Sequence, residues 1–94
     1  MERQIKLYAL STCAWCKKMK KFLSDRTIPY ELEDIDLLTG DVKAEVKAEV
    51  AKHNPRLSYP TLVIDGGATV IVGYDEDKLQ ELFGQAATEG ETAR

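Results

Sequence analysis

The chain has 94 residues, 44% of them hydrophobic and 31% charged, and a formal net charge of −3 at pH 7. This length fits a single domain, and the balance of apolar and charged residues is ordinary for a globular protein. The small net charge gives no reason to expect nucleic acid or an anionic membrane as a partner. No apolar run approaches the roughly 20 residues that a membrane-spanning helix needs, so we expect no membrane association.

The N-terminus leads almost directly into the first apolar segment, without the apolar core of a secretory leader. We therefore expect a cytoplasmic protein. In a reducing compartment the closely spaced Cys13 and Cys16 are expected to be catalytic or metal-binding rather than structural. A closed zinc site takes four ligands, whereas this sequence offers two cysteines and one histidine, His53. We thus expect redox chemistry, no metal site and no catalytic role for His53.

The sequence predicts a strand before the two cysteines and a helix that begins at them. Residues 4–10 alternate between polar and apolar and end in an apolar run, which predicts a strand buried on at least one face. Ser11 or Thr12 is expected to cap the helix that follows. One face of this helix is apolar and the other basic, the two sets being Cys16, Met19, Phe22 and Leu23 against Lys17, Lys18, Lys20 and Lys21. Cys16 is therefore expected to point inward, and Cys13 to be the more exposed sulfur.

This placement predicts the chemistry of the pair. A thiol in the first turn of a helix lies near the positive end of the helix dipole and near free backbone N–H groups, which favour the thiolate. A second cysteine one turn away then suffices to make and break disulfides. We expect Cys13 to attack the substrate disulfide and Cys16 to displace the product from Cys13.

A second strand and a second helix follow. The alternating stretch 30–36 predicts a strand with an acidic outward face. The helix is expected to begin at 39–41 and to end at the Asn54-Pro55 pair. Its valines recur at every fourth position, at Val42, Val46 and Val50.

The last part of the domain is predicted to form a hairpin and a helix. Two β-branched runs, 59–64 and 68–72, predict a hairpin around the turn Asp65-Gly66-Gly67. Asp75 is expected to cap a final helix, whose buried side chains are Leu79, Leu82 and Phe83. We expect the domain to span 1–84 and residues 85–94 to form a disordered tail.

The resulting order, β-α-β-α-β-β-α, predicts an α/β protein. Its first two strands are joined through a helix and should be parallel, with a right-handed crossover, while the hairpin adds two antiparallel strands. The expected architecture is a four-stranded mixed sheet with helices on both faces.

Three motifs in order resemble those of the glutaredoxins, over nearly the whole stretch from Ile5 to Phe83. Segment 8–16 (YALSTCAWC) stands where glutaredoxins carry a tyrosine-led strand and then Cys-Pro-Tyr-Cys. Segment 59–66 (YPTLVIDG) is similar to their Thr-Val-Pro followed by a strand that ends in Ile-Asp-Gly. Segment 72–76 (VGYDE) is similar to the Gly-Gly-x-Asp-Asp turn that begins their last helix.

The resemblance implies a thioredoxin-like fold and a thiol–disulfide oxidoreductase that reduces protein disulfides or glutathione mixed disulfides with Cys13 and Cys16. It implies a monomer with no tightly bound cofactor and with glutathione as a co-substrate. It also implies a cis bond between Tyr59 and Pro60 that faces the cysteines, and N–H groups at the start of the last helix that bind a carboxylate of glutathione. The residues expected to contact the substrate or glutathione are Thr12, Ala14, Trp15, Tyr59, Pro60, Gly73, Tyr74, Asp75 and Glu76.

The sequence departs from the family pattern at positions that bear on substrate choice. Ala14 and Trp15 replace the proline and tyrosine between the cysteines, and Leu10 stands where many glutaredoxins have a lysine. If that lysine holds a carboxylate of glutathione, this chain needs another cation, such as Lys52 or Arg56, or binds glutathione weakly. Two alternatives therefore stay open: an electron donor recharged by thioredoxin reductase for a partner such as ribonucleotide reductase, and an iron–sulfur cluster carrier.

Overall fold

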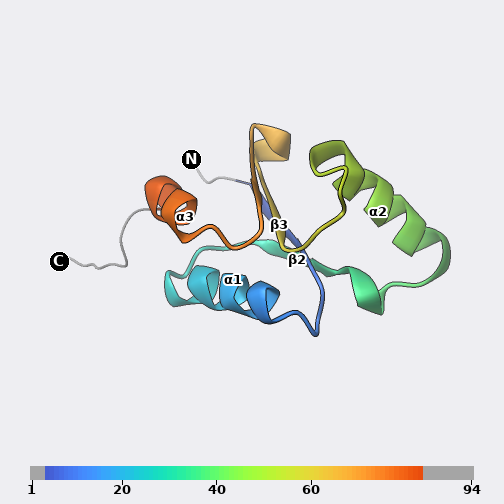
Figure 1. The fold of residues 1–94 in the computed structure, drawn as a ribbon, viewed down its shortest axis with the longest axis horizontal. Helices are drawn as coiled ribbons and strands as arrows, with labels where there is room; N and C mark the ends of the chain where they lie inside the picture. The colour runs from blue at the N-terminus through green and yellow to red at the C-terminus, as the bar shows by residue number, and fades with distance from the viewer. Residues whose placement is uncertain (1–3, 84–94) are drawn as a thin grey trace.

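The computed structural model describes residues 4–83, and the tail expected at 85–94 lies outside them. Within that range the elements follow the predicted order (Figure 1). The strands are β1 (Ile5–Ala9), β2 (Glu31–Asp34), β3 (Thr61–Ile64) and β4 (Thr69–Val72). The helices are α1 (Ala14–Asp25), α2 (Gly40–His53) and α3 (Glu76–Phe83), with short 3₁₀ turns η1 (Ile35–Leu37) and η2 (Asp65–Gly67). None of the helices in this range is long and apolar enough to span a membrane.

The four strands form the predicted mixed sheet, in the order β2-β1-β3-β4. β1 runs parallel to β2, with Ala9 beside Asp34, and antiparallel to β3, which forms a hairpin with β4. Because β1 and β2 are parallel, both end at the same edge of the sheet. The segments that follow them, 10–13 and 35–37, meet there, and Ser11 bonds to Asp36 across this edge.

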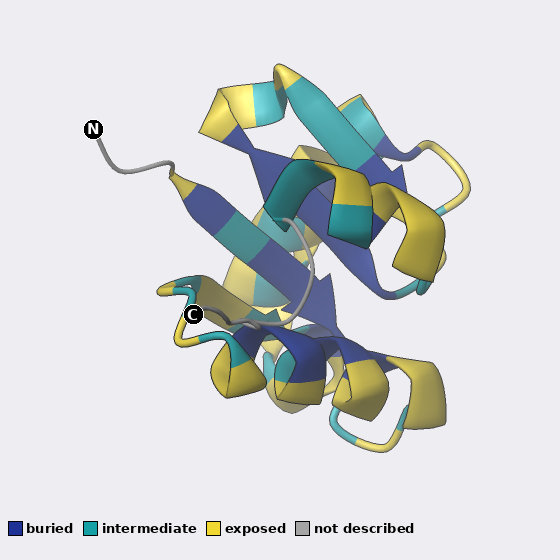
Figure 2. Cartoon of the chain, turned by 90° about the vertical axis from the view of Figure 1, so that its left-hand side faces the viewer, coloured by how far each residue is buried: buried dark blue, intermediate teal, exposed yellow. Residues whose placement is uncertain are grey.

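Helices cover both faces of the sheet, as predicted. Successive residues of β1 point to opposite faces, so Leu7 belongs to the hydrophobic cluster beneath α1 and α3, and Tyr8 to the cluster beneath α2. Figure 2 shows the buried residues concentrated in the strands and on the inner sides of the helices. Leu79 of α3 is fully buried, while Leu82 and Phe83 are half-buried at the margin of the first cluster.

Helix α2 lies where the sequence predicted it, but its regularly spaced valines do not form one buried stripe. Val50 is fully buried, Val46 is half-buried, and 55% of the surface of Val42 is exposed. A helix turns about 100° per residue, so a spacing of four drifts by about 40° at each step. The valine row therefore winds away from the sheet, and α2 is anchored mainly through its C-terminal half.

Candidate active site

The two cysteines occupy the junction between β1 and α1. Cys13 has the extended backbone of an N-cap residue, and its Sγ accepts a hydrogen bond from the backbone N–H of Cys16 at 3.2 Å. The prediction that Ser11 or Thr12 caps this helix is therefore wrong. Ser11 instead bonds to Asp36, and the Cys13 sulfur takes the place at which a capping oxygen usually accepts the N–H of the third helical residue.

The surroundings of Cys13 favour its thiolate. Desolvation acts to raise the pKa of Cys13, but hydrogen bonds from the Cys16 thiol and from the N–H groups of Cys16 and Trp15, together with the charge of Lys20, hold the pKa below its ordinary value. Lys20 pairs with Asp34 at 3.0 Å and lies one helical turn beyond Cys16. The nucleophile predicted from the sequence thus has the electrostatic surroundings that a nucleophilic thiol needs.

Cys16 has the opposite environment. Its exposed fraction is 0%, and it lies within the cluster formed by β1, α1 and α3. Burial, followed by the neighbouring Cys13, raises its pKa to about 12, against a hydrogen bond from the N–H of Leu10 to its Sγ at 3.4 Å. The structure thus agrees with the expected asymmetry: Cys16 points inward and is protonated at neutral pH, while Cys13 is half-exposed.

A backbone hydrogen bond connects two segments that contain expected contact residues, 59–60 and 73–74. The Tyr59–Pro60 peptide bond is cis, as the resemblance implied, and the carbonyl of Pro60 accepts the N–H of Gly73 at 2.7 Å. Gly73 has φ +80°, a left-handed conformation that favours glycine, so the chain can turn there into Tyr74. The hydroxyl of Tyr59 is buried, and the described residues offer it no hydrogen-bond partner.

The aromatic residue between the cysteines is held in place by its neighbours. The rings of Trp15 and Tyr74 stack with centroids 6.0 Å apart and planes 25° apart, and the Nζ of Lys18 lies 4.8 Å from the centre of the Trp15 ring. Tyr74 also contacts Phe22 edge-on. Trp15 nevertheless remains 55% exposed. The fold therefore brings Trp15, two residues after Cys13, against Tyr74, which follows it by 59 residues in the sequence.

The remaining expected contact residues are Asp75 and Glu76 at the start of α3 and Thr12 and Ala14 beside Cys13. The carboxylate of Asp75 accepts the N–H of Lys78 at 3.2 Å and so caps α3, as predicted. Glu76 is exposed in the first turn of α3, and Thr12 and Ala14 are exposed on either side of Cys13. The hydrogen bonds of Asp75 thus stay within its own turn.

Two polar pairs near the cysteines were missed by the sequence analysis. Ser11 bonds to Asp36, and Lys20 pairs with Asp34. The partners are 25 residues apart in the first pair and 14 in the second, so no short sequence pattern indicates either pair. The predicted parallel pairing of the first two strands could have found the Ser11–Asp36 pair, because it places the chain after Ala9 beside the chain after Asp34.

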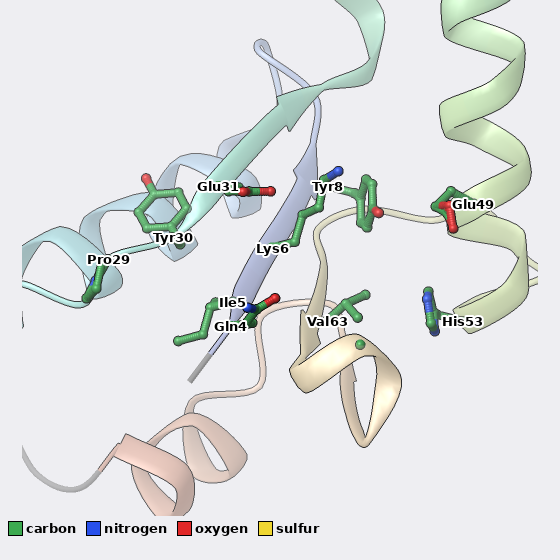
Figure 3. Close-up of a pocket in the computed structure, with 11 residues that line it drawn as sticks. Gln4, Ile5, Lys6, Tyr8, Pro29, Tyr30, Glu31, Glu49, His53 and Val63 are labelled. Atoms are coloured by element: carbon green, nitrogen blue, oxygen red, sulfur yellow. The ribbon is translucent and has the colours of Figure 1, made fainter. Parts of the chain in front are cut away.

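A hollow of about 570 Å³ lies elsewhere on the molecule, between α2, the first residues of β1 and the start of β2 (Figure 3). Its lining includes Tyr8, Glu49 and His53 and none of the expected site residues. Within residues 4–83 no group of three or more His, Cys, Asp or Glu side chains is placed to hold a metal ion. We therefore locate the candidate active site at the cysteines.

Known proteins are similar to this chain in sequence and in fold. The family model of glutaredoxin matches residues 5–68. A glutaredoxin-like 8.6 kDa protein from a rubredoxin operon of Clostridium pasteurianum is 31% identical over 84% of this chain and 96% of its own length. Methanoredoxin of Methanosarcina acetivorans is 38% identical with a TM-score of 0.81, covering 87% of this chain and 85% of that one. A glutaredoxin of Archaeoglobus fulgidus is 33% identical with a TM-score of 0.78, covering 87% of each chain. With a matching family model, this degree of identity and the same fold, the chain belongs to the glutaredoxin family.

Proposed function

We propose that this protein is a dithiol oxidoreductase that reduces protein disulfides or glutathione mixed disulfides, with Cys13 as nucleophile and Cys16 as resolving thiol. The observation that supports this assignment best is the difference between the two sulfurs. Cys13 accepts hydrogen bonds at the helix start and keeps a lowered pKa, whereas Cys16 is buried with its pKa raised to about 12. A low-pKa thiol beside a sheltered one is what disulfide exchange requires.

The reaction has two displacements. The Cys13 thiolate attacks one sulfur of the substrate disulfide, the substrate S–S bond breaks, and the departing sulfur leaves with the electron pair and takes up a proton. Cys16 then loses its proton and attacks the Cys13 sulfur, which releases the second substrate thiol and leaves a Cys13–Cys16 disulfide. The substrate gains two electrons and the protein loses two, so an external thiol or a reductase must return them.

Single substitutions test these roles. Cys13→Ser should abolish all disulfide reduction, because the remaining thiol, Cys16, is fully buried and has its pKa raised to about 12. Cys16→Ser should retain reactions of glutathione mixed disulfides that need one thiol, and should lose the reduction of protein disulfides. Disulfide reductase activity in Cys13→Ser would contradict the assignment.

The electron donor is a separate question, and one residue favours a second candidate function. Leu10, which stands where many glutaredoxins have a lysine, packs against both hydrophobic clusters and brings no cation to the site. This favours a redoxin recharged by thioredoxin reductase and dedicated to a protein partner. Turnover of one generic disulfide with glutathione plus glutathione reductase, compared with thioredoxin reductase, separates the two donors. Visible absorption of an anaerobic preparation would instead support the iron–sulfur carrier.

A further inference from the structure

The loop that joins β1 to α1 is tied to the neighbouring chain segment by one carboxylate. Asp36 lies in η1, just beyond the end of β2. Its Oδ1 accepts the backbone N–H of Ser11 at 2.8 Å, and its Oδ2 accepts the hydroxyl of Ser11 at 2.5 Å. Both oxygens of one carboxylate therefore hold one residue of the active-site loop, across a sequence separation of 25 residues.

The residue before Ser11 contacts both cysteines through its backbone. The N–H of Leu10 donates to the Sγ of Cys16 at 3.4 Å, and the carbonyl of Leu10 accepts the N–H of Cys13 at 3.2 Å. The carbonyl of Leu10 and the N–H of Ser11 belong to the same planar peptide group. The Asp36 carboxylate and the Cys13 N–H therefore fix this plane from its two ends.

From this geometry we propose that Asp36 is a positioning residue for the second displacement: by holding Ser11, it keeps the N–H of Leu10 on the Cys16 sulfur while negative charge develops there. This inference rests on the proposed dithiol function. The carboxylate is ionised at neutral pH, since the two hydrogen bonds from Ser11 hold the pKa of Asp36 below its usual range.

The two displacements depend on different hydrogen bonds. The Cys13 thiolate is stabilised by N–H groups of the first turn of α1, those of Trp15 and Cys16, which the Asp36 carboxylate does not touch. The Cys16 sulfur must instead carry negative charge inside the hydrophobic cluster, where an N–H donor counts for more than it would in water. Loss of Asp36 should therefore slow the attack of Cys16 on Cys13 and spare the attack of Cys13 on the substrate.

The experiment measures both rates in the full-length protein. A glutathione-labelled peptide disulfide serves as substrate; the first rate is the formation of the mixed disulfide on Cys13, and the second is its decay to the Cys13–Cys16 disulfide, both followed by mass spectrometry after acid quenching. In Asp36→Ala the decay should slow by about tenfold, the size expected for the loss of one hydrogen bond to a charged group. The formation rate should stay within about twofold of the wild type, because the N-cap bonds are unchanged.

Three variants serve as controls. Asp36→Asn keeps a carbonyl oxygen for the Ser11 N–H and should restore most of the decay rate, and Ser11→Ala removes only the hydroxyl bond and should have a small effect. Asp25→Ala removes an exposed carboxylate whose partner is Lys21 and should change neither rate. Far-ultraviolet circular dichroism checks that each variant is folded.

Each outcome decides between the alternatives. A wild-type decay rate in folded Asp36→Ala would overturn the inference, and an equal loss of both rates would show that Asp36 only supports the loop as a whole. If wild-type protein forms no mixed disulfide on Cys13, the proposed function itself fails, and this result is distinct from the first two.

Discussion

Cys13 and Cys16 lie one helical turn apart, yet the fold gives their sulfurs opposite ionisation behaviour. The Cys13 sulfur stands at the N-cap and accepts hydrogen bonds, whereas the Cys16 sulfur is fully buried. Burial opposes ionisation at both sites, and only at Cys13 do the hydrogen bonds outweigh it. In the proposed mechanism, the order in which the two thiols act follows from which of them caps the helix.

The pH dependence of alkylation tests this difference directly. Iodoacetamide should modify Cys13 with a midpoint below the ordinary thiol value of 9.0, while Cys16, measured in Cys13→Ser, should stay unreactive well above that pH. Because the folded pKa of Cys16 lies above its unfolded value, its contribution to stability is complete below about pH 9 and is lost as the pH rises toward 12. Equal alkylation midpoints for the two cysteines would contradict the assignment.

Trp15 offers a second test at this scale, because it is the only tryptophan in the sequence. A stacked aromatic pair contributes roughly 0.5–1.5 kcal/mol, so Tyr74→Ala should release the Trp15 ring from its present orientation. Acrylamide should then quench the tryptophan emission more strongly than in the wild type. Tyr74→Phe keeps the ring and should behave as the wild type does. Unchanged quenching in Tyr74→Ala would show that Lys18 alone holds the indole.

The side chain of Asn54, which is buried, fixes the loop that connects the elements α2 and β3. The Nδ2 of Asn54 donates to the carbonyl and the hydroxyl of Ser58, both at 3.0 Å, and lies 3.1 Å from the hydroxyl of Thr61. The Oδ1 of Asn54 accepts the N–H of Arg56 at 3.2 Å. Asn54 thus joins the end of α2 to the segment that contains Tyr59 and Pro60.

Removal of this amide should destabilise the protein. Asn54→Ala leaves polar partners in a buried position without their donor, which typically costs about 1–3 kcal/mol in the free energy of unfolding. Urea denaturation measures the loss. Ser58→Ala is the matched control: Ser58 is exposed and supplies one of several acceptors, so its substitution should change stability by less than about 0.5 kcal/mol. A loss no larger in Asn54→Ala than in the control would mean that the loop is held by packing alone.

Local patterns predicted most of these elements, and long-range contacts explain where they failed. The alternation of β1, the turn at Asp65 and the Cys-x-x-Cys spacing each carry their signal within about ten residues, so the first strand, the hairpin and the cysteines lie where expected. The strand predicted over 30–36 is shorter in the structure: β2 ends at Asp34, and Ile35 and Asp36 lie in the turn η1. The cap of α1 was wrong because Asp36, far along the chain, takes the N–H and hydroxyl of Ser11. The roles of Lys20 and Asp34 escaped notice for the same reason.

In the molecule as a whole, the two faces of the sheet are unequally covered. Within residues 4–83, the cluster beneath α1 and α3 contains 11 buried residues, and the cluster beneath α2 contains four. Four residues of α1 are buried, compared with only Val50 in the longer α2. Both cysteines belong to the better packed face, since Cys16 is part of the larger cluster and Cys13 packs against it. The two cysteines therefore lie on the more extensively buried side of the sheet.

This asymmetry predicts the order in which the helices open. Backbone amides exchange through local unfolding, and elements with few buried apolar contacts open at the lowest cost. The amides of α2 should therefore exchange hydrogen for deuterium faster than those of the interior of α1. Val50→Ala, which removes two buried methyl groups at roughly 0.8 kcal/mol each, should accelerate exchange in α2 further and leave α1 unchanged.

Leu23→Ala, in the larger cluster, should lower protection in both helices, because the stability of the whole fold depends on that cluster. Equal protection of α1 and α2 in the wild type would mean that the sheet distributes its stability across both faces despite the difference in burial.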